Sequence, residues 1–203
     1  MAKTINEINA DHSARVGAIM TWYQDRKDDI RAAREPEDGS YLEHLTGDQR
    51  LGILRQQKLE QAQDAFEQTL EASREEAERY QAEVEKRRQT LKVKLFEVED
   101  AGALARAALA TEAELGVLMD TAADANNLEL ARAVFTAATR RGLGEHLGTY
   151  FDLDPEARGL YEEWSQLPDE AFLQRARENV ERVVVMPSGE QLDPLPINMA
   201  SVG

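Results

Sequence analysis

The residues with the clearest potential for chemistry are three histidines, because imidazole acts as a general base or a metal ligand. His12, His44 and His146 lie far apart in the sequence, and no HExxH or comparable ligand pair occurs. We therefore interpret them as surface or boundary residues. The sequence contains no cysteine, which excludes disulfides, thiolate nucleophiles and cysteine-ligated zinc or iron–sulfur sites.

A second candidate is a calcium loop between residues 152 and 163. Four carboxylates fall at the positions that bind the ion in a calcium loop, and they belong to Asp152, Asp154, Glu156 and Glu163. The sixth position of such a loop requires glycine for a sharp turn, but here it is Ala157, which follows Pro155 closely. A helix that is capped by Asp154 and begins at Pro155 explains the same residues with fewer assumptions.

Three glycines within residues 142–148 superficially resemble a phosphate-binding loop. The segment follows a predicted helix, has the wrong glycine spacing and lacks the lysine of a P-loop. We interpret it as a helix-terminating loop in which Gly142 forms the C-terminal cap.

The main concentration of basic residues falls late in the longest predicted helix. Five cations occur within nine residues, and they are Lys86, Arg87, Arg88, Lys92 and Lys94. They could contact phosphate, yet no aromatic residue interleaves with them for base stacking, and acidic residues surround them. We interpret them as a solvated stripe, with a nucleic acid or an acidic partner surface as the alternative ligand.

Composition excludes further classes of protein. The chain has 203 residues, 39 acidic and 24 basic, and a formal net charge of −15 at pH 7. That charge repels phosphate backbones and anionic lipid, so nucleic-acid binding is disfavoured. The longest aliphatic stretch, at about 183–186, is far shorter than the roughly 20 residues that cross a bilayer. We expect neither membrane insertion nor secretion by a signal peptide.

The elements that must position these residues are helices. Four Ser or Thr residues begin capping boxes, in which Glu or Gln follows three positions later: Thr4, Ser40, Thr46 and Thr111. Helical periodicity, prolines and glycines then predict helices at 5–34, after Ser40, at 48–100, at 101–110, after Thr111, at 128–141, at 155–167 and at 170–184.

The predicted helix at 48–100 is too long for a compact domain. At about 1.5 Å per residue it extends roughly 75 Å, so it must project or pair along its length. Apolar residues recur every seven positions from Leu70 to Val98, and a companion series begins at Leu59. Arg87 and Lys94 fall in that second series and weaken a two-stranded seam. We therefore favour an antiparallel hairpin or multi-helix packing over a parallel zipper.

The C-terminal residues 185–203 form a different kind of segment. Three prolines and a Ser-Gly turn oppose helix and favour an extended arm. Its apolar candidates for partner binding, together with the residues just before it, are Val183, Val184, Val185, Leu192, Leu195 and Ile197. The arm either folds back onto its own helices or packs on another subunit, as a strand added to a neighbour's edge would.

Residues 127–135 (NLELARAVF), 147–158 (LGTYFDLDPEAR) and 161–164 (YEEW) resemble helical stretches in small accessory proteins of tailed-bacteriophage particles. The resemblance implies a virion or head-assembly component that acts by assembly and not by turnover. Scaffolding proteins of such phages are also acidic, helical and free of cysteine, but many end in a basic capsid-binding helix. The apolar arm of this chain favours a head–tail connector or a minor structural protein instead.

We therefore predict an all-α fold with a long hairpin or coiled-coil-like region at 1–100, a small helical bundle at 101–184 and an extended arm at 185–203. The expected function is that of a non-enzymatic structural or assembly subunit, without catalytic residues, cofactor or metal. Its expected partners are copies of itself and other virion or assembly proteins, in the virion or in the cytoplasm of a bacterial host. The alternative is an acidic scaffolding or chaperone-like adaptor for a basic partner. An enzyme with its site in an unrecognised carboxylate cluster is a third class.

Overall fold

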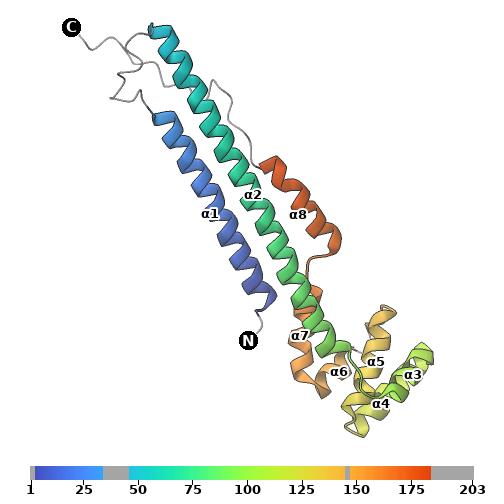
Figure 1. Cartoon of the computed structure of the whole chain (residues 1–203). Helices are drawn as coiled ribbons and strands as arrows, with labels where there is room; N and C mark the ends of the chain where they lie inside the picture. The colour runs from blue at the N-terminus through green and yellow to red at the C-terminus, as the bar shows by residue number, and fades with distance from the viewer. Residues whose placement is uncertain (1–2, 34–45, 145–146, 184–203) are drawn as a thin grey trace. The chain divides into compact units, whose positions relative to one another are not determined.

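The computed structural model describes residues 3–33, 46–144 and 147–183, and within them the chain is all-α, as predicted (Figure 1). The helices are α1 (Ile5–Ala32), α2 (Gly47–Phe96), α3 (Ala101–Leu109), α4 (Glu112–Asp124), α5 (Leu128–Arg140), α6 (Leu147–Leu153), α7 (Pro155–Ser165) and α8 (Glu170–Val183).

Local capping chemistry sets most helix starts. The carboxylate of Glu7 accepts from the Thr4 backbone N–H at 2.7 Å, and the Thr111 N–H is held by Glu114 at 2.7 Å, so both predicted capping boxes are confirmed. At the start of α2 the Thr46 N–H donates to Gln49 Oε1 at 2.9 Å in the same way. These pairs satisfy backbone donors that a helix start otherwise leaves without partners.

The helices differ from the prediction by more than two residues at two places. α2 ends at Phe96 and not at residue 100, because Asp100 has extended dihedrals and its side chain caps α3 by accepting from Gly102 and Ala103. A residue in that conformation cannot continue the preceding helix. The second difference is α6, which begins inside the segment interpreted as a loop. Gly142 does close α5 there, with a left-handed φ of +73°.

The chain divides into two compact units. We call residues 9–81 with 169–203 the hairpin unit, and residues 1–8 with 82–168 the bundle unit. This division differs from the predicted boundary at residue 100: the last part of α2 belongs with the bundle, and α8 belongs with the hairpin. The reason is side-chain packing, since Leu95 near the end of α2 is fully buried in the bundle core.

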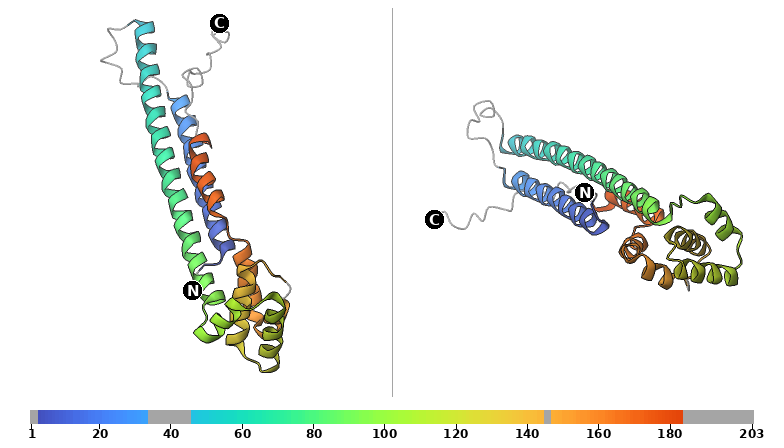
Figure 2. Two further views of the ribbon diagram at one scale, coloured as in Figure 1. Left: turned by 90° about the vertical axis from the view of Figure 1, so that its right-hand side faces the viewer. Right: turned by 90° about the horizontal axis from the view of Figure 1, so that it is seen from below.

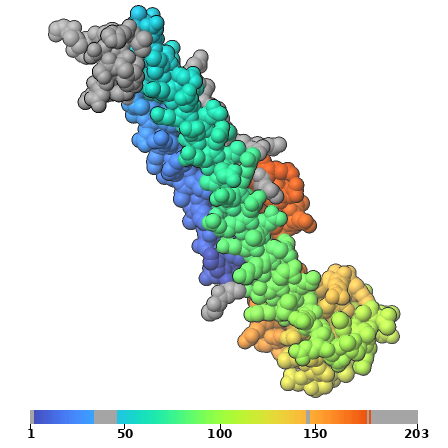
Figure 3. Space-filling view, viewed as in Figure 1, coloured from blue at the N-terminus to red at the C-terminus, as the bar shows by residue number. Residues whose placement is uncertain are grey.

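In the hairpin unit α1 and α2 run side by side in every view (Figure 2). They are antiparallel, because Asn9 near the start of α1 accepts from Tyr80 at 2.9 Å whereas the carbonyl of Arg31 near its end accepts from Lys58 at 3.0 Å. This is the hairpin that the sequence favoured over a parallel zipper. Its core contains Tyr23, Ile30, Ala62 and Ala65. In the space-filling view of Figure 3 the surface of α1, in blue, lies directly against that of α2, in teal to green.

The bundle unit packs α3 to α7 around α5, whose residues from Leu130 to Ala138 are buried except for Arg132. Phe135 is fully buried and stacks on Tyr150 of α6 at 4.4 Å between ring centroids. Trp164 of α7 and Phe96 of α2 form a T-shaped pair with 5.2 Å between ring centroids. Aromatic contacts of this kind supply much of the apolar burial in a small core.

Two predictions lie outside the described residues. These are the short helix after Ser40 and the extended arm with Val184, Val185, Leu192, Leu195 and Ile197. Val183 is the last residue of α8. No described helix combines the length and the apolar run that a bilayer crossing requires.

Candidate functional site, an apolar groove on the hairpin

The hairpin unit carries a groove of about 410 Å³ between α1 and α2. Its lining residues come from one turn of each helix, and they are Ala18, Ile19, Trp22, Gln68, Thr69 and Ala72. A groove of this volume lies within the range of ordinary binding pockets. We therefore consider this concave, apolar surface, which lies among the described residues, as a candidate functional site.

The groove arises from unequal side-chain sizes on the two helices. α1 contributes the large side chains of Ile19 and Trp22 beside Ala18, whereas α2 contributes the small side chains of Thr69 and Ala72 beside Gln68. Small residues opposite large ones leave space along the helix contact, and Trp22 keeps 43% of its surface exposed. A tryptophan with this much open surface is typical of an anchor for a partner protein.

The polar group in the floor of the groove is already satisfied. Thr69 is fully buried, and its hydroxyl donates to the carbonyl of Ala65 one turn earlier at 2.7 Å. The hydroxyl therefore has its donor bond within its own helix. The floor offers apolar contact, and specificity must come from the rim.

Next to the groove, the buried carboxylate of Glu76 on α2 joins the two helices of the hairpin through partners on α1. Glu76 is 3% exposed and accepts from Arg15 Nε at 2.7 Å, while its other oxygen lies 2.8 Å from His12 Nδ1. The ring of His12 stacks on Tyr80 at 4.1 Å between centroids. This set of contacts fixes the register of α1 against α2, which is the best attested role of buried polar groups between helices.

Burial raises the pKa of Tyr80, whose hydroxyl donates to Asn9. The tyrosine therefore stays neutral and acts as a hydrogen-bond donor at physiological pH. His12 accordingly lies half-buried at the hairpin contact, which is a boundary position of the kind that the sequence predicted. His44 and His146 lie outside the described residues.

The outer face of α2 carries a stripe of carboxylates beside the groove. Its members recur at intervals of three or four residues, so they share one face of the helix, and all are exposed: Glu60, Asp64, Glu67, Glu71, Glu75 and Glu78. We call this set the acidic stripe. Asp64 and Glu71 lie one turn on either side of Gln68, and Glu75 lies one turn beyond Ala72. The acidic stripe therefore forms the α2 rim of the groove.

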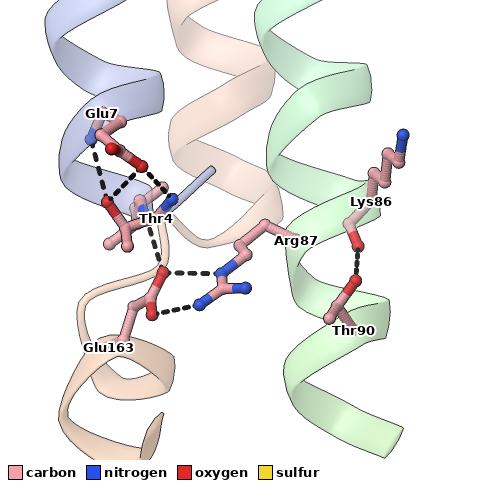
Figure 4. Close-up of polar contacts among 7 residues, drawn as sticks. Thr4, Glu7, Lys86, Arg87, Thr90 and Glu163 are labelled. Carbon is pink, nitrogen blue, oxygen red and sulfur yellow. Dashed lines mark hydrogen bonds and ion pairs between the residues drawn. The ribbon is translucent and has the colours of Figure 1, made fainter. Parts of the chain in front are cut away.

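In the bundle unit the predicted basic patch is divided between buried and exposed positions. Arg87 is 8% exposed and forms a two-bond ion pair with Glu163 of α7, at 2.7 Å from Nε and 2.5 Å from Nη2 (Figure 4). The same carboxylate accepts from the Ile5 backbone N–H at 2.7 Å. These donors lower the pKa of Glu163, the hydrogen bond from Arg87 most of all. Arg87 is thus part of the fold and not of a solvated stripe.

Arg88 is also engaged, because it donates to Glu85 and to the carbonyl of Pro168. The other three cations, Lys86, Lys92 and Lys94, are exposed. The structure therefore does not bring the five cations together on one open surface.

Three of the four carboxylates of the rejected calcium loop have separate structural partners. Asp154 caps α7 by accepting from Ala157, as predicted, and lies 3.7 Å from Arg132. Asp152 pairs with Arg158 at 3.4 Å, and Glu163 holds Arg87.

Sequence reasoning missed the groove because a groove depends on which helix faces which. The available signal was that Ala18, Ile19 and Trp22 lie on one face of the predicted first helix. Comparison of the chain with protein-family models, with curated proteins and with solved structures gives no match.

Proposed function

We propose that the protein is a non-enzymatic structural or assembly subunit that associates with other copies of itself and binds a further protein through its helices. The observation that carries the proposal is the composition and exposure of α3. This helix contains a single charged residue, Arg106, in a chain of net charge −15. Its last residue, Leu109, is 87% exposed, and Ala105 one turn earlier is exposed on the same face.

Charge favours α3 as the contact between copies. Two hairpin units that approached each other through their acidic stripes would repel each other. Two α3 helices that approached each other would not, because α3 contains no carboxylate. Small residues such as Ala105 also allow helices to approach closely. Val117 of α4, which is 65% exposed, adds apolar surface to the bundle unit.

A phage virion is the setting that we propose for this role, as a head–tail connector or a minor structural protein. Support comes from the resemblance of residues 127–135, 147–158 and 161–164 to accessory proteins of phage particles, and these stretches fall in α5, α6 and α7. The exposed acidic stripe favours a second candidate, the acidic adaptor for a basic partner.

Sedimentation velocity of the full chain over about 1 to 100 µM tests self-association, since mass action makes an oligomer depend on concentration. We expect species heavier than the 22.8 kDa monomer, and a larger share of them when salt screens the net charge. A particle of monomer mass at every concentration and salt would contradict the proposal.

A further inference from the structure

We propose that the groove on the hairpin unit binds an amphipathic helix of another protein, one whose apolar face is flanked by lysine or arginine. This inference rests on the proposed function, because it names the chemistry of the partner that the assembly subunit binds. It depends on three features: the shape and lining of the groove, the charge of its rim, and the repulsion that excludes a second copy.

The groove favours a helix as its ligand. It lies between two antiparallel helices, and its walls are side chains of α1 and α2. The described residues contain no strand edge to which an extended peptide could add. An amphipathic helix instead inserts side chains spaced three or four residues apart, and Trp22 and Ile19 on one wall provide contacts at the same spacing.

The lining calls for apolar anchors. Ile19, Trp22 and Ala72 offer carbon surface, and the buried hydroxyl of Thr69 already donates to the carbonyl of Ala65. One turn away, Arg15 is held by Glu76 at 2.7 Å. An apolar side chain that enters the groove would therefore leave neither Thr69 nor Arg15 without its hydrogen-bond partner. Leucine, isoleucine or phenylalanine on the partner helix fits this surface.

The rim adds the requirement for positive charge. Asp64, Glu71 and Glu75 lie within one helical turn of the groove residues Gln68 and Ala72, and all three are exposed. Cations on the flank of a helix seated in the groove would lie beside them. Such rim pairs contribute to steering and selectivity more than to raw affinity, and they respond to salt.

The same charges exclude a second copy of this chain as the ligand. A copy that docked through its own hairpin unit would place its acidic stripe against the first one. Like charges at such close range oppose association. The copy-to-copy contact that we propose at α3 is thus a different surface from the groove.

A pair of synthetic peptides tests the inference on the full chain. Both are about 18 residues, or five helical turns, with leucine at every third or fourth position. One carries lysine and the other glutamate on the flanks of the leucine face. Binding is measured by the anisotropy of a labelled peptide and by the emission of Trp22 in a Trp164→Phe background. We expect the lysine peptide to bind at least about tenfold more tightly than the glutamate peptide, and the difference to shrink in high salt.

Variants of the chain locate the binding. The rim variant is Asp64→Asn, Glu71→Gln and Glu75→Gln, which keeps side-chain size while removing charge. The matched control removes three exposed carboxylates outside the groove: Glu97→Gln, Asp120→Asn and Asp124→Asn. The rim variant should lose at least about fivefold in affinity for the lysine peptide, and the control less than twofold. Ile19→Ser should weaken both peptides, with circular dichroism confirming that the helices remain.

Three results would overturn the inference: no binding of either peptide, equal binding of both, or loss of self-association in the Ile19→Ser variant, which would make a second copy the ligand. Failure with the peptides while the chain still self-associates would leave the proposed assembly role standing. If the full chain stays monomeric at all concentrations but still binds the lysine peptide, the assembly role would be contradicted and the groove would remain a binding site for a basic helix.

Discussion

Arg87 of α2 and Glu163 of α7 form a two-bond ion pair, with donor–acceptor distances of 2.7 Å and 2.5 Å. Arg87 is 8% exposed and Glu163 is 14% exposed, so water competes little for either partner. Because the same carboxylate also accepts from the Ile5 N–H, one side chain ties the end of α2, the start of α1 and α7 together within the bundle unit. Bidentate arginine–carboxylate pairs combine strength with fixed geometry.

Removing the arginine should destabilise the bundle unit. Arg87→Ala leaves Glu163 with only the Ile5 N–H as a donor, and breaking a buried pair in this way costs about 3 kcal/mol. Denaturant unfolding followed by Trp164 in a Trp22→Phe background reports on this unit. The control is the exposed neighbour Lys86→Ala, which should change the free energy of unfolding by less than about 0.5 kcal/mol. Equal effects of the two substitutions would show that the ion pair is not important for stability.

The stabilisation from Glu163 should depend on pH in a defined direction. Hydrogen bonds from Arg87 lower the pKa of Glu163 in the folded protein, so folding favours the carboxylate form. The contribution is therefore fully present above the unfolded pKa, at about pH 4.3, and is lost as the pH falls through the lower folded pKa. We expect the difference in unfolding free energy between wild type and Glu163→Gln to be constant from pH 7 to pH 5 and to shrink below that. A difference that grows on acidification would have the wrong sign.

In the hairpin unit Glu76→Ala should have a large effect because Arg15 and His12 lose their shared acceptor inside the helix contact. We expect a cost of about 3 kcal/mol, measured through Trp22 in a Trp164→Phe background. Glu75→Ala is the matched control, since Glu75 is the exposed neighbour on the same helix. If both variants unfold at the same denaturant concentration, the buried carboxylate does not hold the hairpin together.

The cap of α5 offers a test of backbone strain. Gly142 has a φ of +73°, and a Cβ placed there would meet no atom within 4 Å. Gly142→Ala should therefore destabilise the bundle unit by about 1 kcal/mol through its dihedral angle alone. Gly144→Ala is a suitable control because its added Cβ also meets nothing within 4 Å and its φ is not in the left-handed region. A neutral effect at Gly142 would indicate that the cap can relax.

Sequence reasoning succeeded where the determinants are local. Thr4 with Glu7, Thr46 with Gln49 and Asp154 before Pro155 each act within one helical turn, and all three starts are confirmed. The absence of proline likewise predicted α2, whose end was misplaced only because Asp100 caps the next helix. α6 was missed since it is only seven residues long and begins inside a glycine-rich segment.

Features that depend on distant contacts could not be derived in this way. The heptad spacing places Arg87 on the same helix face as Leu59 and Tyr80, but Glu163 lies 76 positions away, so the sequence could not identify it as the partner. The groove likewise needs Ala72 to face Trp22 across the hairpin. The spacing of three and four residues that defines the acidic stripe is visible in the sequence. Its role as a rim depends on the groove beside it, which the sequence does not show.

Sedimentation equilibrium of a paired set of variants tests the assembly role most directly. One variant is Ala105→Lys with Leu109→Lys on the exposed face of α3, and the matched control adds the same charge to the hairpin as Gln56→Lys with Gln63→Lys. We predict that the α3 variant stays at the 22.8 kDa monomer mass at concentrations where wild type and control form heavier species. Wild type, control and α3 variant all of the same mass at every concentration would contradict the account.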